Sequence, residues 1–180
     1  MLLYRFLLIT SVLFLMASCA SKKKAADSRR SAPRREVRAK APTSVYEKKK
    51  DHRVDKVISA ARSFMGTPYR WGGTTRAGMD CSGLLVTSFR AADMPLPRTT
   101  SDQKRVGHGV SIYELQPGDL VFFAAAKKNS KKITHVGMVT EVRDKHDVRF
   151  IHASTKLGVT ENNIYTDYYR KIFIKARRPF

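Results

Sequence analysis

Two stretches in the middle of the chain place their apolar residues at helical spacing. Across residues 54–65 the apolar side chains fall on one face, and Gly66 followed by Pro68 ends the pattern. A second amphipathic stretch begins at Cys81 and extends to about Asp93, shortly before two prolines. The pattern therefore predicts two helices, separated by an irregular segment that is rich in glycine.

Beyond the second helix the hydrophobic pattern becomes that of β-strands. Residues 119–123 follow a Gln-Pro-Gly turn signal and are apolar after the first position, which predicts a buried strand. Residues 134–142 and 148–154 predict a hairpin, because only a short polar turn separates them, and residues 171–175 predict a last strand. Helices followed by antiparallel strands indicate an α+β domain, with the N-terminal helices packed on a small antiparallel sheet.

The first 18 residues have the pattern of an export signal. A single early charge, Arg5, precedes an apolar run that is too short to span a membrane comfortably, and small residues lead directly to Cys19. This end resembles the bacterial lipobox, in which the signal is cleaved before the cysteine and the new N-terminal residue receives lipid. We therefore expect a signal peptide over residues 1–18 and lipidation of Cys19. An ordinary signal peptide, or a short membrane anchor with an incidental cysteine, is the alternative.

A basic segment, residues 19–53, separates this signal from the rest. It consists mainly of Lys, Arg, Ser, Ala and Pro, so it cannot bury enough apolar surface to fold, and we expect a disordered tether. The tether serves either as a spacer or as an electrostatic attachment to anionic lipid or wall polymer. One folded domain is expected over residues 54–180.

The net charge of the chain limits the classes of partner that it can bind. The formal net charge is +20, shared about equally between the tether and the folded part. A basic chain suits nucleic acid, an anionic membrane or the acidic polymers of a bacterial envelope. The export pattern and the scarcity of aromatic residues in the basic segment argue against nucleic acid. We expect a lipid-anchored protein of the bacterial envelope that faces the periplasm, on the outer membrane.

Cys81 is the candidate nucleophile. It stands where the glycine-rich segment gives way to the second predicted helix, and the first amide hydrogens of a helix are unpaired and carry partial positive charge. Both features favour a thiolate over a thiol. If Cys19 carries lipid, no cysteine remains to pair with Cys81 in a disulfide. The alternative is that Cys81 is a small buried apolar residue.

Two histidines supply a candidate base and its support. Because side chains alternate along a strand, His135 shares a face with Gly137, and His152 shares the apolar face of its own strand. If those strands form the predicted hairpin, both imidazoles can point toward the helix that begins at Cys81. We interpret His135 as the general base and His152 as the residue that orients it. Hydrogen-bonded histidines of the core are the alternative.

A thiol, a base and an orienting residue together suit acyl transfer. Attack of the sulfur on an amide gives a thioester, and the same base protonates the leaving amine. The amide of Cys81 and the hydroxyl of Tyr69 would stabilise the oxyanion, unless Tyr69 only packs. Zinc would find ligands in Cys81, His135, His152 and Asp80, but the spacings match no compact zinc motif. We therefore expect neither a metal nor another cofactor.

Five segments of the folded part form a pattern that is more specific than any single motif. They are GTPYRWGGTTRAGMDCSG (66–83), LPRTTSDQ (96–103), LQPGDLVFF (115–123), THVGMV (134–139) and FIHAS (150–154). Together they resemble the NlpC family of cell-wall cysteine peptidases, and most closely its small lipoprotein members, the murein endopeptidases of the Spr type. The resemblance covers roughly residues 54–180 and implies a papain-like fold.

The same resemblance implies roles for individual residues. It makes Cys81 the nucleophile and His135 the general base. His152 becomes the third polar residue, at a position where the family accepts His, Asn or Gln. Tyr69 lies in the wall of the active site. The residues implied to line the substrate groove are Asp80, Ser82 and Arg98.

The substrate implied by the resemblance is the peptide stem of peptidoglycan. The bond hydrolysed is either the D-alanine to diaminopimelate cross-link or the bond between D-γ-glutamate and diaminopimelate. We expect a monomeric enzyme held at the membrane through the lipid on Cys19. A non-catalytic peptidoglycan-binding scaffold lipoprotein, and an amidase or acyltransferase of the same fold, are the alternatives.

Overall fold

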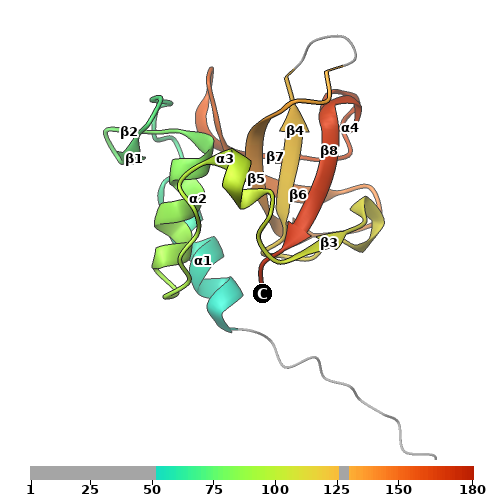
Figure 1. Ribbon diagram of the computed structural model, residues 1–180, viewed down its shortest axis with the longest axis horizontal. Helices are drawn as coiled ribbons and strands as arrows, with labels where there is room; N and C mark the ends of the chain where they lie inside the picture. Colours follow the sequence, from blue (N-terminus) through green and yellow to red (C-terminus); the bar gives the residue numbers. More distant parts are fainter. Residues whose placement is uncertain (1–51, 126–129) are drawn as a thin grey trace, which may run out of the picture. The chain divides into compact units, whose positions relative to one another are not determined.

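The computed structural model describes residues 52–125 and 130–180, in which helices pack against a sheet (Figure 1). The two predicted helices are confirmed as α1 (His52–Ser63) and α2 (Cys81–Arg90). α2 ends before the predicted limit, and the chain then turns at Asp93, whose φ of 57° lies in the left-handed region. The glycine-rich segment between the helices contains a small hairpin, β1 (Thr74–Thr75) with β2 (Gly78–Met79).

An antiparallel sheet of six strands forms the second part of the described domain, in the order β3-β8-β4-β5-β6-β7. The three central predictions are confirmed as β4, β5 and β6, and β5 pairs with β6 as the predicted hairpin. This arrangement confirms the α+β fold. The strand bounds are β3 (His108–Val110), β4 (Leu120–Ala124), β5 (Ile133–Val142), β6 (Val148–Ser154), β7 (Gly158–Asn163) and β8 (Phe173–Arg178).

The edges of the sheet and the short helices escape the hydrophobic pattern. The predicted last strand over 171–175 is correct only in part, because its first two residues end helix α4 and β8 begins at Phe173. β3 and β7 are short or polar, so no apolar run marks them. The short helices that the pattern misses are α3 (Thr100–Gln103), η1 (Ile112–Glu114) and α4 (Asp167–Ile172).

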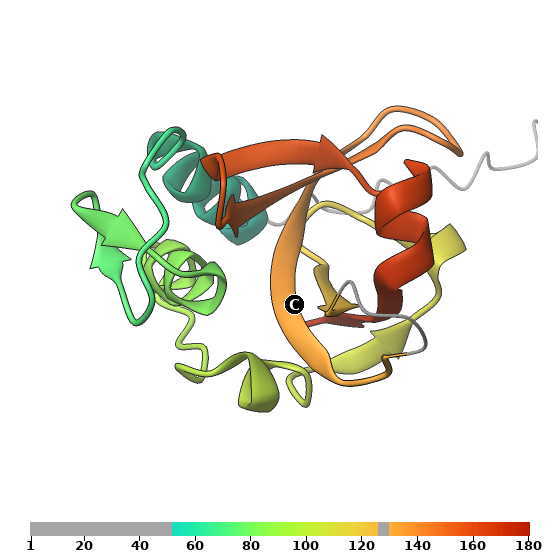
Figure 2. The same cartoon turned by 90° about the horizontal axis from the view of Figure 1, so that it is seen from above.

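Both faces of the sheet are buried. Along β4 consecutive side chains alternate, so that Leu120 and Phe122 pack with α1 and α2, while Val121 and Phe123 pack on the other face with Tyr169 of α4. Figure 2 shows α1 and α2 on one side of the sheet and α4 on the other. Each fully buried Leu or Phe contributes about 2 kcal/mol of hydrophobic stabilisation. Burial on both faces explains why the sequence of β4 is apolar without interruption.

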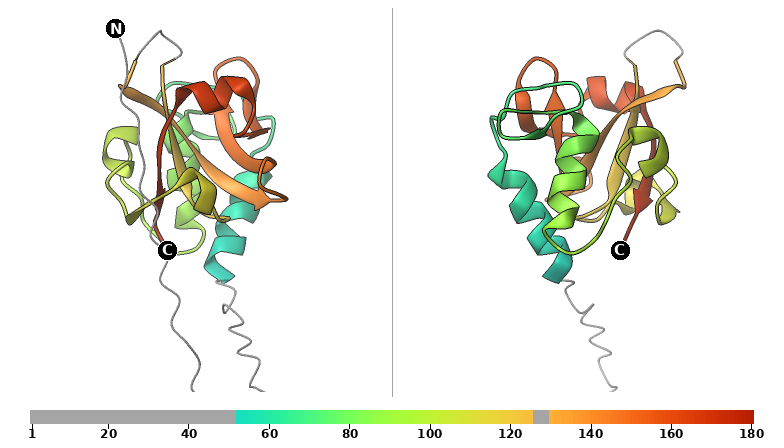
Figure 3. Two further views of the ribbon diagram at one scale, coloured as in Figure 1. Left: turned by 90° about the vertical axis from the view of Figure 1, so that its right-hand side faces the viewer. Right: turned by 60° about the vertical axis from the view of Figure 1, so that its left-hand side comes forward.

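The two long helices lie side by side and fix the position of Cys81. The right-hand view of Figure 3 shows α1 and α2 packed together along their length. The buried face of α1 contains Val57, Ile58 and Ala61. α2 packs Leu84, Leu85 and Phe89 into the same core. Since α2 is held along one face by this core, its first residue cannot shift relative to the sheet without disrupting the packing.

The N-terminal features predicted from the sequence lie outside the described residues. These are the signal peptide over 1–18, the lipidation site at Cys19 and the tether up to residue 51. Among residues 52–125 and 130–180, no helix has the length and apolar character needed to cross a membrane. α1 begins at His52, within two residues of the predicted start of the folded domain.

Candidate active site

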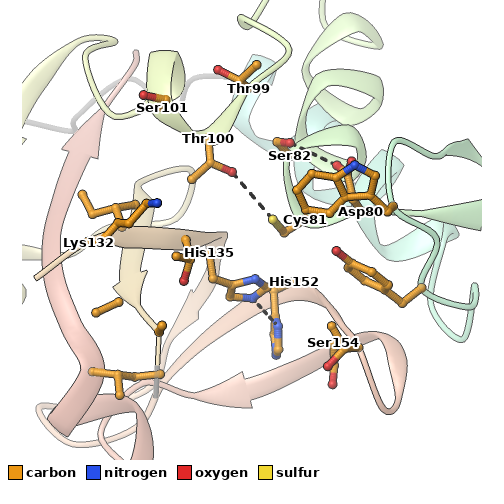
Figure 4. Close-up of a pocket in the computed structure, with 18 of the residues that line it drawn as sticks. Asp80, Cys81, Ser82, Thr99, Thr100, Ser101, Lys132, His135, His152 and Ser154 are labelled. Carbon is orange, nitrogen blue, oxygen red and sulfur yellow. Dashed lines mark hydrogen bonds between the residues drawn. The ribbon is translucent and has the colours of Figure 1, made fainter. Parts of the chain in front are cut away.

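A pocket of about 900 Å³ opens where the start of α2 meets β4, β5 and β6. Cys81, His135 and His152 all line it, and Figure 4 shows the His135 ring between the thiol and the second histidine. The structure thus brings together residues from three separate elements. The other residues singled out from the sequence also line this pocket: Tyr69, Asp80, Ser82 and Arg98.

Asp80 fixes the start of α2. It is the N-cap residue, and its carboxylate accepts hydrogen bonds from the N–H of Gly83 at 2.6 Å and from the N–H of Gly72 at 2.8 Å. The first bond caps the helix, and the second ties the glycine-rich segment to it. The glycine-rich segment also lies directly against Gly83, and only a glycine fits there, because a Cβ would collide with the carbonyl oxygen of Gly73. The DCSG sequence therefore holds Cys81 at the first position of the helix.

Arg98 and Ser82 complete the surroundings of the Asp80 carboxylate. Arg98 donates to Oδ2 of Asp80 at 2.7 Å and to Oδ1 at 3.0 Å, and it also donates to the Ser82 hydroxyl at 2.9 Å. That hydroxyl donates in turn to Asp80 at 3.0 Å. Burial alone would raise the pKa of Asp80, but the bonds from Arg98, Gly83 and Ser82 outweigh it and lower the pKa. Both oxygens of the Asp80 carboxylate are therefore bonded to donors of the protein itself, and Arg98 is the more exposed member of the ion pair.

The short helix α3 lies beside the thiol. Oγ1 of Thr100 is 3.7 Å from Sγ of Cys81, a weak hydrogen bond that involves sulfur. The buried side chain of Gln103 donates to the carbonyl of Ser82 at 3.2 Å and to that of Pro97 at 2.9 Å, and so ties α3 to the first turn of α2. Thr100 is a neighbour of Cys81 that the sequence reasoning missed, although it lies inside the LPRTTSDQ segment.

Burial determines the state of the Cys81 thiol. It raises the pKa of Cys81, and the charge of Asp80 adds to this, while hydrogen bonds from Thr100 and from the N–H of Val136 act in the opposite direction without outweighing it. The position of Cys81 at a helix start predicts a stabilised thiolate, which would lower the pKa of the thiol. In the structure this pKa is raised instead, because the sulfur is shielded from water and the residue that caps the helix, Asp80, is itself an anion.

The two histidines form a directly bonded pair. Nε2 of His135 lies 2.8 Å from Nδ1 of His152, and the His152 ring stacks on Phe150 with centroids 4.9 Å apart. Gly137 makes room for this pair, because a Cβ there would lie 2.6 Å from the Phe150 ring and 2.8 Å from the carbonyl oxygen of Ile151. Burial lowers the pKa of both histidines, and His152 lowers that of His135 further, to about 3. Both rings are therefore neutral at pH 7.

Tyr69 contributes a phenol to the same pocket. Its backbone forms an isolated bridge with Met79, which holds it against the segment before α2. The pKa of Tyr69 is raised, first by burial and then by Cys81 and Asp80. Its hydroxyl therefore stays protonated at neutral pH and can donate a hydrogen bond to a developing negative charge.

The chemistry of the pocket suits nucleophilic attack on a carbonyl carbon. It combines a buried thiol, a neutral imidazole pair and a phenol that can donate. In the part of the chain that the structure describes, no group of three or more His, Cys, Asp and Glu is arranged to hold a metal ion.

The chain is similar to known proteins over the region that contains this pocket. The chain matches the model of the NlpC/P60 family over residues 66–178. It is 43% identical to the probable endopeptidase NlpC of Escherichia coli K12 over 118 residues, which are 65% of this chain and 72% of that protein. It is 35% identical to the murein DD-endopeptidase MepS/murein LD-carboxypeptidase of the same organism over 124 residues, which are 68% of this chain and 61% of that protein. A crystal structure of an NlpC/P60 family protein from Bacillus cereus is similar with a TM-score of 0.61 at 32% identity, covering 69% of this chain and 39% of that one.

Proposed function

Because the chain belongs to the NlpC/P60 family and is a cysteine-type peptidase, we propose that it is an endopeptidase that hydrolyses amide bonds in the peptide stems of peptidoglycan. The observation that carries the proposal is the single pocket shared by Cys81, His135 and His152. The similarity to a murein DD-endopeptidase supports the substrate class.

The proposed reaction begins with transfer of the thiol proton. Nε2 of His135 is engaged by His152, which leaves Nδ1 of His135 to accept the proton from Sγ of Cys81. The sulfur then attacks the carbonyl carbon of the substrate amide. The amide N–H of Cys81, at the start of α2, and the hydroxyl of Tyr69 are the donors for the resulting oxyanion.

Two further steps complete hydrolysis. The C–N bond of the substrate breaks as protonated His135 gives its proton to the leaving amine, and the acyl group stays on Cys81 as a thioester. Water then attacks the thioester carbonyl and gives a proton to His135. The C–S bond breaks, the carboxylic acid product leaves, and the proton returns to the sulfur.

The charges that line the pocket favour an anionic substrate. Asp80 and Arg98 neutralise one another through their paired hydrogen bonds. Lys132 also lines the pocket and is exposed, so it gives the groove a positive charge. Peptide stems that carry free carboxylates have the complementary sign.

Digestion of cell-wall material tests the proposal. The purified full chain and its Cys81→Ala form are incubated with intact peptidoglycan and with isolated muropeptides, and the products are identified by mass spectrometry. Conversion of cross-linked dimers to monomers would identify the D-alanine to diaminopimelate bond. Release of disaccharide-dipeptides would identify the D-γ-glutamate to diaminopimelate bond. If the protein binds the wall without forming products, the proposed hydrolysis of peptidoglycan is wrong and a binding scaffold replaces it.

We also propose that the enzyme is held in the bacterial envelope by lipid on Cys19, facing the periplasm from the outer membrane. The apolar run and the small residues before Cys19 support this location. A Cys19→Ala form should lose its lipid mass and move to the soluble periplasmic fraction after a high-salt wash. The wash releases protein held only by the basic tether, so retention of this variant on washed membranes would contradict the anchor.

A further inference from the structure

Asn162 of β7 stands at the end of a hydrogen-bonded chain that includes both histidines. Its Oδ1 atom lies 2.9 Å from Nε2 of His152, and Nδ1 of His152 lies 2.8 Å from Nε2 of His135. The pairing of β6 with β7 explains the first contact. Asn162 is opposite Phe150, and His152 is two residues further along the same face.

The amide oxygen of Asn162 determines which atom donates and which accepts in each of these hydrogen bonds. Oδ1 of Asn162 can only accept, so Nε2 of His152 must carry a hydrogen. In a neutral ring the other nitrogen, Nδ1, then has a lone pair, and it accepts the hydrogen on Nε2 of His135. Neutral His135 is left with its own lone pair on Nδ1. That is the nitrogen that the proposed proton transfer from Cys81 requires.

Tyr169 of α4 holds the amide group in place. Its hydroxyl donates to Oδ1 of Asn162 at 3.1 Å and lies 3.2 Å from Nε2 of His152. The phenol packs edge-on against Phe150, with ring centroids 4.8 Å apart at 84°. Oδ1 of Asn162 therefore accepts two hydrogen bonds, one from Nε2 of His152 and one from the hydroxyl of Tyr169, whose ring is itself held by packing.

We infer that Asn162 is a positioning residue that sets the tautomers of both histidines and so leaves Nδ1 of His135 able to act as a base. The inference rests on the proposed function for the reaction that this base serves. With the amide turned over, its NH₂ group would donate to His152 and reverse each bond of the chain. His135 would then carry a hydrogen on Nδ1 and have no lone pair for the thiol.

The tautomers can be observed directly, without any substrate. In the protein labelled with ¹⁵N-histidine, long-range ¹H–¹⁵N spectra at neutral pH should show a hydrogen on Nε2 of both His135 and His152. In Asn162→Leu the partner left for Nε2 of His152 among the described residues is the Tyr169 hydroxyl, which has lost Oδ1 of Asn162 as its acceptor and can donate to this nitrogen instead. We expect the pattern to reverse, and kcat on muropeptides to fall by at least ~10-fold with KM nearly unchanged, since a wrong tautomer costs far more than this in a serine triad.

Two further variants separate positioning from folding. Asn162→Asp keeps an acceptor at the same place and should restore the Nε2 hydrogens and most of the activity. Glu161→Gln, on the neighbouring position of β7, loses only an exposed pair with Arg62 and should match the wild type in spectrum and kcat. Thermal unfolding shows that each variant is folded.

The spectra test the hydrogen bonds and the digestion assay tests the proposed function, so either can give a negative result without the other. A hydrogen on Nδ1 of His152 in the wild type, or unchanged tautomers and kcat in Asn162→Leu, would overturn the inference. If the tautomers respond as expected but no peptidoglycan product forms, the hydrogen-bond chain is as described and the proposed function is at fault.

Discussion

Nδ1 of His152, the ring nitrogen nearer the backbone, makes the 2.8 Å contact with Nε2 of His135, and the two rings meet at 86°. The contact therefore depends on an acceptor at one particular distance along the side chain at position 152. The oxygen of an asparagine side chain stands at about the position of Nδ1, whereas that of glutamine reaches further, toward the position of Nε2.

This geometry predicts a difference between two substitutions at His152. His152→Asn places Oδ1 where Nδ1 was and should retain the bond to His135, so kcat should fall by no more than ~10-fold. His152→Gln should lose more, because its oxygen lies beyond the contact. His152→Leu, which has no acceptor, should be the least active of the three. The measurement is kcat on muropeptides for each variant, and a Gln form more active than the Asn form would contradict the assignment.

The alternation of side chains along strands predicts the histidine pair well. His135 and His152 lie on two strands separated by a short polar turn, and the hairpin of β5 and β6 brings them together in the structure, although its register shifts between Val139 and Glu141. The start of α2 at Cys81 is equally well predicted, because an amphipathic pattern follows the glycine-rich segment there, and the structure adds that Asp80 caps this helix. Both features follow from the order of apolar and polar residues within a short stretch of sequence.

The parts of the site that the sequence does not reveal depend on distant contacts. Asn162 lies on a polar edge strand, and Tyr169 lies on a short helix, so no hydrophobic period marks either position. Thr100 reaches Cys81 from α3, a short helix that Gln103 ties to α2. The direction of the shift in the thiol pKa also follows from burial, which depends on the packing of the whole domain.

The Asp80–Arg98 pair predicts a stability difference that depends on pH. The carboxylate is largely buried, so Arg98→Met should destabilise the fold by about 1–2 kcal/mol at pH 7, discounted for the exposure of Arg98. The folded-state pKa of Asp80 is lowered, so its stabilisation is present above the usual value of 3.8 and is lost as the pH falls through the folded value. The difference between wild type and variant should therefore shrink in acid.

Urea unfolding at neutral and acidic pH measures this effect. Arg62→Met is the matched control, because Arg62 pairs with Glu161 on the exposed surface. Its cost should stay below about 0.5 kcal/mol at either pH. Equal costs for the two arginine variants would mean that the Asp80 pair is no more than a surface ion pair.

Gly137 predicts a steric effect on the histidine pair. An alanine Cβ at this position would lie 2.6 Å from the Phe150 ring and 2.8 Å from the carbonyl oxygen of Ile151, and the backbone oxygen has little freedom to move. Gly137→Ala should cost about 1–3 kcal/mol of unfolding free energy and should also lower kcat, because His152 is displaced with β6. At Gly109 the nearest atom would be 3.8 Å away, so Gly109→Ala is the control and should change little. Equal stability of the two variants would contradict the close packing.

The electrostatics of the pocket predict how the thiol reacts with pH. Burial raises the pKa of Cys81 above its usual 9.0 and lowers that of His135 to about 3, so between these values both groups are neutral and no thiolate–imidazolium pair forms at rest. In Cys19→Ala, where Cys81 is the remaining cysteine, alkylation by iodoacetamide should be slow at neutral pH and should accelerate continuously through pH 9.

Thr100→Val sharpens this test of the thiol. The variant removes a hydrogen bond that lowers the pKa of Cys81, so its alkylation profile should move to still higher pH. The urea-unfolded protein is the control, since its thiol should titrate near the usual value. A resting ion pair would instead give rapid alkylation that stays level across the acidic and neutral range. That result would mean that His135 is charged before substrate binds, and the proton would then be transferred before the attack on the carbonyl begins.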